Sequence, residues 1–495
     1  NRLRAAAKLT GKLGPSTSIG VLGAFSDVVH PEATHNLLKR GERETGYAVA
    51  RTTHEFADGK HRVGFMGTGV WRQVDPDATT PRRDAYSGGA DWELNLGDRE
   101  WRVAGSMAYT VVDPHRLGDV DPGLQEGSAG TLDLRRTSGD WRGGVTGSYK
   151  SDRFDPNDIG FLSANDEVYT RAWLQYRHDA DGAGSRLKAS HVYLQVHRSW
   201  LYGEQRQVDP LTGGLLWDHA GGHPQGAGVY LESWNQTHGY QELRCEASLD
   251  LAGTSKYATR TFDGRRGPLM STPRRGEVEL RWQSDWRRDL VGSVEGEIGG
   301  SEAGDRHLAA SWSLRTDVGR HLGLSLAAGY RDSHDDAHWL LNTPYEPGIG
   351  GVGHVFAELD QQTVDATLRG SWLPHRDLSL ELYLQPYMTA GQYRNRRYLA
   401  TPDSRDLRPY DPGDGSQPAR DRDFTFASFV LNLVLRWEYR PGSTAYLVFT
   451  HGRDRYRARA TAADGGFEPQ LRSELLFDQE PRNTVLLKID HWFAL

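Results

Sequence analysis

The residues of this chain whose types could do chemistry are histidines and carboxylates spread over 495 positions. The sequence holds 19 His and a single cysteine, Cys245, so neither an internal disulfide nor a cysteine-based metal site can form. No His-Glu-x-x-His or similar spacing occurs. Two histidine pairs lie beside carboxylates, His30 with His35 and His334 with His338. Either pair could bind a metal ion, but solvated loops are the simpler interpretation, and we predict no metal site and no cofactor.

Carboxylates in Pro- and Gly-containing segments are the other candidates for metal binding. Asp119, Asp121, Asp155 and Asp158 could hold Ca²⁺ through oxygen ligands. Their spacing is not that of an EF-hand, and Asp is a common residue of turns. We therefore interpret these four residues as turn formers and keep calcium binding as an alternative.

A hydrolase would need a nucleophile with a base in reach. Two hydroxyl residues directly precede a histidine, in Ser190-His191 and Thr450-His451. Both pairs lie in extended segments, where adjacent side chains point to opposite faces, so neither pair can form a dyad. We predict that the protein is not an enzyme and has no catalytic residue.

Polar residues that alternate with apolar ones are more informative. We expect the following residues to line the lumen of a barrel: Glu242, Arg244, Glu246, Glu279, Arg281, Glu381, Tyr383, Asn432, Arg436, Glu438, Lys488 and Asp490. Because the set contains both signs of charge, a lumen lined by it would select only weakly between anions and cations. A ladder of cross-strand ion pairs that stiffens the wall is a compatible interpretation.

The elements that carry these residues have a period of two. In residues 424–439, alternate positions from Ala427 to Leu435 are apolar, and the series ends with Trp437 and Tyr439. This pattern is typical of a strand that faces lipid and ends in an interfacial aromatic girdle. Similar alternation recurs in the segments 101–111, 242–251, 277–286 and 378–389.

The composition excludes several classes of protein. Glycine accounts for 57 residues, while hydrophobic residues make up only 37% and aromatic residues reach 10%. A soluble chain of this length usually has more aliphatic residues, and a disordered chain has fewer aromatic ones. No apolar stretch approaches the ~20 residues of a membrane-spanning helix. The net charge of −7 gives no reason to expect nucleic acid as a partner.

The connections between the extended segments alternate between short and long, as they do in outer-membrane barrels. The long connections are expected near residues 30–43, 74–84, 113–126, 151–166, 200–227, 252–274, 333–352, 393–421 and 456–482. We predict an all-β fold, a large antiparallel transmembrane β-barrel of roughly 20–22 strands with short periplasmic turns and long extracellular loops. Three loops, 200–227, 393–421 and 456–482, are long enough to fold inward and constrict a pore.

The two ends of the chain bear on the strand count. The first strand, about 2–11, precedes a short turn, and the last strand, 483–495, follows a long loop. Both would run toward the periplasm, so the C-terminus would be periplasmic and the number of strands odd, at roughly 21. A single-chain bacterial barrel normally closes with an even number. We therefore predict that residues 1–495 form one barrel domain that lacks an upstream region with at least one further strand.

The final strand carries a pattern common in outer-membrane proteins, an amphipathic strand with aromatic residues near the terminus. Ile489, Trp492 and Phe493 are expected to act as the signal for barrel insertion, although the last residue is Leu495. The expected partners are therefore the barrel-assembly machinery during insertion, and outer-membrane lipid and lipopolysaccharide afterwards.

Four segments resemble the DUF5916 family of Gram-negative barrels. They are Ala5–Lys12 with Ser18–Leu22, Phe154–Leu162, Arg265–Met270 and Leu487–Phe493, spread over nearly the whole chain. Arg266 stands where the family usually has Gly. In that family these segments usually follow a carbohydrate-binding-like domain and an early barrel strand, which agrees with the missing upstream region. The resemblance implies no established reaction and no catalytic residue.

Two functions remain open from the sequence. The strand number and the polar lumen predict a porin-like channel or transporter for polar solutes in the cell outer membrane, with carbohydrates as the solute that the family association implies. The long outer loops, rich in Arg and Tyr as in 393–398, favour instead a non-conducting scaffold that anchors a partner protein or surface assembly. Such a partner would bind at the extracellular loops or in the lumen.

Overall fold

The computed structural model describes residues 3–27, 44–73, 83–114, 123–179, 185–208, 215–259, 267–411, 422–458 and 470–492. Nearly all regular structure in these ranges is β-strand, and the one helical segment among them is a single 3₁₀ turn, η1 (Ser473–Leu476). Among the described residues, no helix has the length and apolar character needed to cross a membrane.

The chain divides into two compact units. The first unit comprises residues 1–176, 194–208 and 218–227, and the second comprises 177–193, 209–217 and 228–495. The first unit contains strands β1 (Leu3–Leu13), β2 (Thr17–Ser26), β3 (Thr45–Phe56), β4 (His61–Arg72), β5 (Arg83–Leu96), β6 (Trp101–Pro114), β7 (Gln125–Arg136) and β8 (Trp141–Lys150), and most of β9 (Glu167–Asp179). Residues of both units make up β10 (Leu187–Trp200) and β12 (Leu215–His219), and β11 (Gln205–Val208) lies in the first.

The second unit contains most of β13 (Pro224–Thr237) and all the later strands. These are β14 (Glu242–Asp250), β15 (Gly253–Ser255), β16 (Met270–Thr272), β17 (Arg275–Gln283), β18 (Leu290–Ser301), β19 (Arg306–Val318), β20 (Leu322–Ile349), β21 (Val352–His375), β22 (Leu378–Leu399), β23 (Leu407–Pro409), β24 (Phe424–Arg440), β25 (Ser443–Ala458) and β26 (Arg482–Asp490). Two short pairs, β11 with β12 and β15 with β16, form small sheets of their own.

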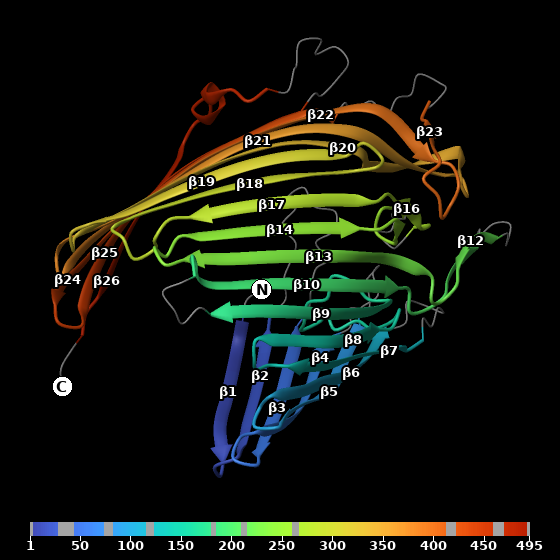
Figure 1. Ribbon diagram of the computed structural model, residues 1–495, viewed down its shortest axis with the longest axis horizontal. Coiled ribbons are helices and arrows are strands. Elements are labelled where there is room, and N and C mark those ends of the chain that lie inside the picture. Colours follow the sequence, from blue (N-terminus) through green and yellow to red (C-terminus); the bar gives the residue numbers. More distant parts are fainter. Residues whose placement is uncertain are drawn as a thin grey trace. The chain divides into compact units, whose positions relative to one another are not determined.

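The long strands pair with their neighbours in chain order, and each printed pairing between them is antiparallel. In the second unit, β13, β14, β17, β18 and β19 lie side by side (Figure 1). This up-and-down order follows from the short turns, because a connection of a few residues can only return the chain antiparallel beside itself. The register keeps residues of like character in rows across the strands, as in Glu246↔Glu279 and Cys245↔Leu280.

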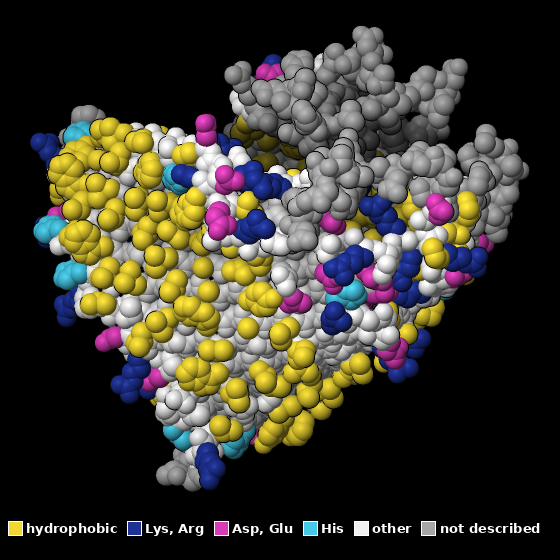
Figure 2. All heavy atoms as spheres, turned by 90° about the horizontal axis from the view of Figure 1, so that it is seen from above, with side chains coloured by type: hydrophobic (Ala, Val, Ile, Leu, Met, Phe, Trp, Pro, Cys, Tyr) yellow, Lys and Arg dark blue, Asp and Glu magenta, His cyan; other side chains and the backbone are white. Residues whose placement is uncertain are grey.

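Each strand has one apolar and one polar face, as the period of two requires. On β17 to β19 the exposed apolar side chains include Val278, Leu280, Trp282, Leu290, Val294, Ile298, Leu308, Trp312, Leu314 and Val318. Figure 2 shows such hydrophobic side chains gathered over a broad area of the surface, with most charged side chains around its margins. A large exposed apolar area of this kind is what a membrane-facing wall presents.

The predicted all-β fold class, with a large antiparallel sheet of roughly 20–22 strands, is confirmed, while closure of that sheet into a transmembrane β-barrel stays a prediction. The described residues contain one sheet of 22 strands. One of them, β23, has three residues and pairs with the far end of β22, so 21 long strands remain. The prediction of one domain with a missing upstream strand is not tested by the structure and stays a prediction.

The prediction of a long loop at 333–352 is wrong. β20 runs to Ile349 and β21 begins at Val352, so a two-residue turn, Gly350-Gly351, joins two long strands. Both glycines have positive φ, at 61° and 73°, which glycine adopts without strain. Register shifts at three places along this hairpin break the alternation of its residues. Because bulges displace the alternating faces, a period-two reading of the sequence loses the strand there.

The last strand is shorter than predicted. β26 ends at Asp490 rather than running to 495, and Trp492 follows it in an irregular segment. The backbone N–H of Trp492 donates to the hydroxyl of Ser443, 3.0 Å away. Of the predicted insertion residues, Ile489 lies within β26, and Phe493 lies outside the described residues.

Candidate functional site

The polar face of the second unit brings together five of the predicted lining residues. β14 contributes Glu242, Arg244 and Glu246, and β17 contributes Glu279 and Arg281. Across the two strands Arg244 lies opposite Arg281, and Glu246 lies opposite Glu279. Like charges directly opposite each other repel, so this wall must be stabilised by diagonal ion pairs and by neighbouring strands.

Glu232 on β13 supplies the main connection in this network. Its carboxylate lies 2.8 Å from the imidazole Nε2 of His191 and accepts hydrogen bonds from the guanidinium of Arg244 at 2.8 Å and the hydroxyl of Tyr230 at 3.0 Å. Arg244 also lies 2.7 Å from Glu246. No local sequence signal identifies His191 and Glu232, because they come from two separate strands and meet only through strand pairing.

A depression of about 540 Å³ opens on this face. Its lining includes the network residues His191, Glu232 and Arg244, together with Arg281 and the indole of Trp234. His191 stacks on Trp234 with ring centroids 5.4 Å apart. The depression therefore offers hydrogen-bond donors, acceptors and one aromatic surface, which suits a polar organic molecule.

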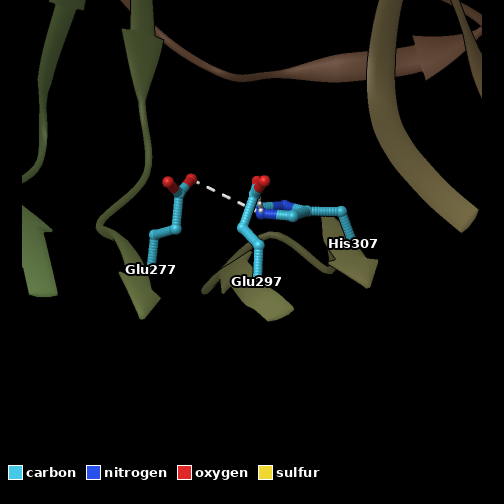
Figure 3. Close-up of side chains that lie close together, drawn as sticks. All are labelled: Glu277, Glu297 and His307. Atoms are coloured by element: carbon cyan, nitrogen blue, oxygen red, sulfur yellow. Dashed lines mark ion pairs between the residues drawn. The ribbon is translucent and has the colours of Figure 1, made fainter. Parts of the chain in front are cut away.

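A second group lies on the same face, where three strands meet. Glu277 on β17, Glu297 on β18 and His307 on β19 point toward one another (Figure 3). Nε2 of His307 is 2.8 Å from Glu297 Oε1 and 3.4 Å from Glu277 Oε2. Glu, Glu and His are a set of side chains that binds divalent metal ions. Sequence motifs could not have revealed this group, because its members come from three separate strands.

Three more predicted lining residues lie together farther along the second unit. Glu381, Tyr383 and Asn432 line a cavity of about 430 Å³ with Arg369. The guanidinium of Arg369 lies 5.3 Å from the ring centroid of Tyr383, and the Tyr383 hydroxyl donates to the Gln385 side chain at 2.8 Å. This cavity also combines an aromatic ring with charged and amide groups.

The remaining predicted residues form two pairs along their own strands. Arg436 and Glu438 on β24 are 3.1 Å apart, and Lys488 and Asp490 on β26 are 2.9 Å apart. Register places Arg436 opposite Tyr446, and Tyr446 opposite Lys488. All twelve predicted residues thus lie on polar faces of strands, while their role in lining a lumen stays a prediction.

The first unit has its own network, which the sequence analysis did not single out. Arg51 pairs with Asp91 at 2.7 Å, and Arg102 pairs with Glu93 at 2.8 Å. Asp133 on β7 accepts from Arg135 at 2.6 Å and from Thr146 at 2.8 Å. Glycines interrupt the alternation of these strands, so their polar faces are harder to recognise in the sequence.

The connection 151–166 folds over the polar face of the first unit. Asp158 forms an ion pair of 2.8 Å with Arg72 on β4, and both side chains are nearly buried, at 7% and 14% exposure. The backbone N–H of Asp155 donates to the Thr110 hydroxyl on β6 at 3.1 Å. Beneath this connection, Thr110 and the cluster formed by Val70, Ala85 and Val112 are buried.

A glycine on β7 allows the connection to approach this closely. A Cβ added to Gly127 would lie 2.2 Å from the backbone nitrogen of Phe154. Within the connection, the side-chain oxygen of Asn157 accepts a hydrogen bond of 2.6 Å from the backbone N–H of Leu162. These contacts hold residues 151–166 in place on the strands. We call this segment loop 151–166.

The predicted metal candidates have protein partners where the structure describes them. Asp158 pairs with Arg72, and the Asp155 carboxylate accepts from Asn157. His334 lies 2.7 Å from Asp360, and His338 lies 3.2 Å from Asp335. The other four candidates lie outside the described residues, namely His30, His35, Asp119 and Asp121.

One turn carries a strongly perturbed carboxyl group. Asp285, between β17 and β18, accepts two side-chain hydrogen bonds from Arg287, each 2.9 Å long, and a backbone one at 3.1 Å. These hydrogen bonds, with the nearby charges of Arg287 and Arg288, lower the pKa of Asp285 to about 2. Arg287 also stacks 3.2 Å from the ring centroid of Tyr240 in the preceding turn. This cluster holds two adjacent turns together.

Comparison with known proteins gives a family and several distant structural likenesses. A family model described as a domain of unknown function, DUF5916, matches residues 1–494. No curated protein matches the chain significantly.

Similar solved structures include the copper transporter OprC, with a TM-score of 0.42 and 11% identity over 99% of this chain and 81% of that one. The outer membrane transporter YddB from Escherichia coli has a TM-score of 0.38 and 8% identity over 90% of this chain and 62% of that one. The ferric-catecholate import receptor Fiu from E. coli K12, in an open form, has a TM-score of 0.33 and 8% identity over 90% and 74%.

Proposed function

The chain belongs to the DUF5916 family, whose description names no function, and we propose that it is an outer-membrane β-barrel that passes polar solutes. The observation that carries this proposal is the division of its strands into one exposed apolar face and one charged face. On β17, Leu280 lies on the apolar face and Glu279 and Arg281 on the other. Such a wall is stable only with lipid on one side and water on the other.

The proposed orientation follows from the connections. Short turns such as 284–289 would face the periplasm, and long connections such as 151–166 would face the cell exterior. The C-terminus after β26 would then be periplasmic. Lipopolysaccharide would contact the outer half of the apolar face, and the barrel-assembly machinery would engage the terminal strand during insertion.

The solutes best matched to the polar face are small, polar and close to neutral, with carbohydrates as the leading class. The cavity at Arg369, Tyr383 and Asn432 combines an aromatic face with donors and acceptors of both charges. Its volume of about 430 Å³ lies within the range of small-molecule sites. Ion selectivity would be weak, because both signs of charge are interspersed along the face.

Loop 151–166 would act as the constriction of this pathway. It covers polar-face residues of β4, β6 and β7, so it occupies space that an unobstructed channel would leave to water. Its two ends are adjacent, since the Asp166 N–H donates to the Ser151 carbonyl at 3.1 Å. The loop can therefore be replaced by a short linker without moving β8 or β9.

Conductance in planar lipid bilayers tests the proposal. We expect discrete conductance steps from the full chain, and larger steps from a variant in which residues 152–165 are replaced by a short Gly-Ser linker. Phe161→Ala is the matched control, because this side chain is 90% exposed and its removal leaves the loop in place. If the wild type and the linker variant are both folded and neither gives conductance steps, the protein is not a channel.

A second candidate function has one specific observation in its favour. β20, β21 and β22 have 28, 24 and 22 residues, whereas a strand needs about 9–11 to span a membrane. The excess carries its own buried cluster of Leu340, Val355 and Ala357. A rigid platform beyond the membrane would suit a scaffold for a partner protein.

The same preparation distinguishes the scaffold from the channel. Excising residues 336–358 and joining the ends by a tight turn would shorten the hairpin, since Asp335 and Leu359 are register partners. A scaffold predicts a silent barrel that co-purifies with a stoichiometric partner and loses it on this excision. A channel predicts unchanged conductance in the shortened variant.

A further inference from the structure

Three potential metal ligands converge on the polar face of the second unit. Glu277, Glu297 and His307 each offer one atom, and all three atoms lie within 4.8 Å of one another (Figure 3). The side chains of Glu297 and His307 are 17% and 15% exposed, so the group is mostly shielded from water. Glu277 is more open, at 40%.

The strand register creates this arrangement. Glu277 on β17 lies opposite Gly299 on β18, and Gly299 lies opposite His307 on β19. Glu297 precedes Gly299 by two residues, so it points to the same face. A Cβ added to Gly299 would lie 2.4 Å from His307 Cε1 and 2.8 Å from its Nε2. The absence of a side chain there lets the imidazole lie across β18 and reach toward Glu277.

The hydrogen bonding of His307 leaves its outer nitrogen available. Nε2 is shielded from solvent and has no hydrogen-bond partner of acceptable geometry, although Glu297 Oε1 is only 2.8 Å away. One Nε2–H could serve only one of the two neighbouring carboxylates. A cation held between the three atoms would satisfy both carboxylates and the nitrogen lone pair together.

The separations suit an ion of transition-metal size. With metal–ligand bonds of about 2.0–2.1 Å, adjacent ligand atoms lie about 2.9 Å apart in an octahedron and about 3.4 Å apart in a tetrahedron. The observed distances from Nε2 are 2.8 and 3.4 Å. Arg331 holds the other oxygen of Glu297, Oε2, at 2.6 Å, so it orients Oε1 toward the imidazole.

We propose that Glu277 Oε2, Glu297 Oε1 and His307 Nε2 bind one divalent transition-metal ion, with Zn²⁺ as the best-matched class and water in the remaining positions. The imidazole ligand selects against Ca²⁺ and Mg²⁺, which take oxygen ligands. The bound ion links β17, β18 and β19 and neutralises two carboxylates that face each other. This inference goes beyond the proposed transport function and is independent of whether the barrel conducts.

Isothermal titration of the full chain in detergent micelles, after chelator treatment and without a histidine tag, tests the site with ZnCl₂. Loss of an outer-shell partner alone weakens metal binding 10–100-fold, so His307→Gln should weaken the Zn²⁺ site at least about ten-fold. His191→Gln is the matched control, because His191 pairs with the single carboxylate Glu232 on the same face. The control should bind Zn²⁺ as the wild type does.

A second variant separates ligand loss from misfolding. Gly299→Ala keeps all three ligands but fills the space under the imidazole, so it should weaken Zn²⁺ binding while leaving the circular dichroism spectrum unchanged. Zn²⁺ should raise the melting temperature of the wild type, and Mg²⁺ should not. The Zn²⁺ effect should be lost in His307→Gln and in Gly299→Ala. A wild type that binds no Zn²⁺, or a folded His307→Gln variant with unchanged affinity and stoichiometry, would overturn the proposal.

Discussion

The polar faces of the two units use the same residue types in different environments. In the first unit, loop 151–166 lies on the strands, and the ion pair of Arg72 with Asp158 is shielded at 14% and 7% exposure. In the second unit, the pair of Arg331 on β20 with Glu297 on β18 is 46% and 17% exposed, and we call this part the open face. Among the described residues, the two pairs differ mainly in how far the arginine is shielded from water.

This difference determines what each ion pair contributes. A shielded charge that loses its partner keeps the cost of its own desolvation, whereas an exposed one is solvated by water. The region around Arg72 and Asp158 should therefore behave locally like a protein core, whereas the Arg331 side chain, at 46% exposure, should behave like a surface residue. Substitutions of the two arginines should therefore differ in their effect.

The largest effect is expected from Arg72→Ala. Removing one partner of a buried pair costs about 3–5 kcal/mol, and here that cost should appear as opening of loop 151–166. Hydrogen exchange of residues 151–166 should accelerate strongly, while β1 and β2 stay protected. Arg153→Ala is the control, because that side chain is 66% exposed. Equal exchange in both variants would mean that the pair does not hold the loop.

A smaller effect is expected from Gly127→Ala. The added methyl group would clash with the Phe154 backbone, because its carbon would lie only 2.2 Å from the nitrogen and the loop would have to move away. Overpacking of this kind costs about 1–3 kcal/mol. Gly147→Ala on β8 is the control, since a Cβ there meets nothing within 4 Å. Protease sensitivity within loop 151–166 should rise in the first variant only.

Strands of the second unit can be predicted from the sequence, whereas the packing of loop 151–166 on the strands of the first unit cannot. Alternation at 242–251 and 277–286 predicts β14 and β17 and places Glu246 and Arg281 on a polar face. The pattern is clear there because one face of each strand is apolar and the other is polar. Loop 151–166 was predicted only as a long connection. Its position depends on contacts with Arg72 and Gly127, which are far away in the sequence and carry no local signal.

Two other differences have the same origin. The segment 333–352 looked like a loop because bulges break its alternation, yet it continues β20 and β21. The ligands Glu277, Glu297 and His307 meet only through the register of three strands. Pairing between strands, which a single sequence does not encode locally, determines both features.

A still smaller effect is expected from Arg331→Ala in the open face. Arg331 is 46% exposed and Glu297 keeps His307 as a neighbour at 2.8 Å, so the loss should stay below the about 3–5 kcal/mol of a buried pair and the unfolding midpoint of the metal-free protein should fall only slightly. Denaturant unfolding of this variant beside Arg72→Ala compares the two faces directly. A loss in Arg331→Ala as large as that in Arg72→Ala would remove the distinction between a covered and an open face.

The smallest effect concerns the turn at Asp285. Because its pKa is held to about 2, below the ~3.9 of an unfolded Asp, its hydrogen bonds with Arg287 stabilise the fold above about pH 4 and are lost as the pH falls toward 2. Asp285→Asn should therefore flatten the decline in stability between these values. Melting temperatures measured between pH 4 and pH 2 test this. An equally steep decline in Asp285→Asn would show that this carboxylate does not stabilise the fold.

Alternate residues of each strand should face lipid and water, and spin labelling along β19 measures this residue by residue. Cys245→Ser removes the only cysteine, after which single cysteines at positions 308 to 314 can carry a nitroxide in lipid vesicles. We expect labels at Leu308, Ala310, Trp312 and Leu314 to relax with oxygen, and those at Ala309, Ser311 and Ser313 to relax with water-soluble chromium oxalate. Equal access of chromium oxalate to both sets would contradict it.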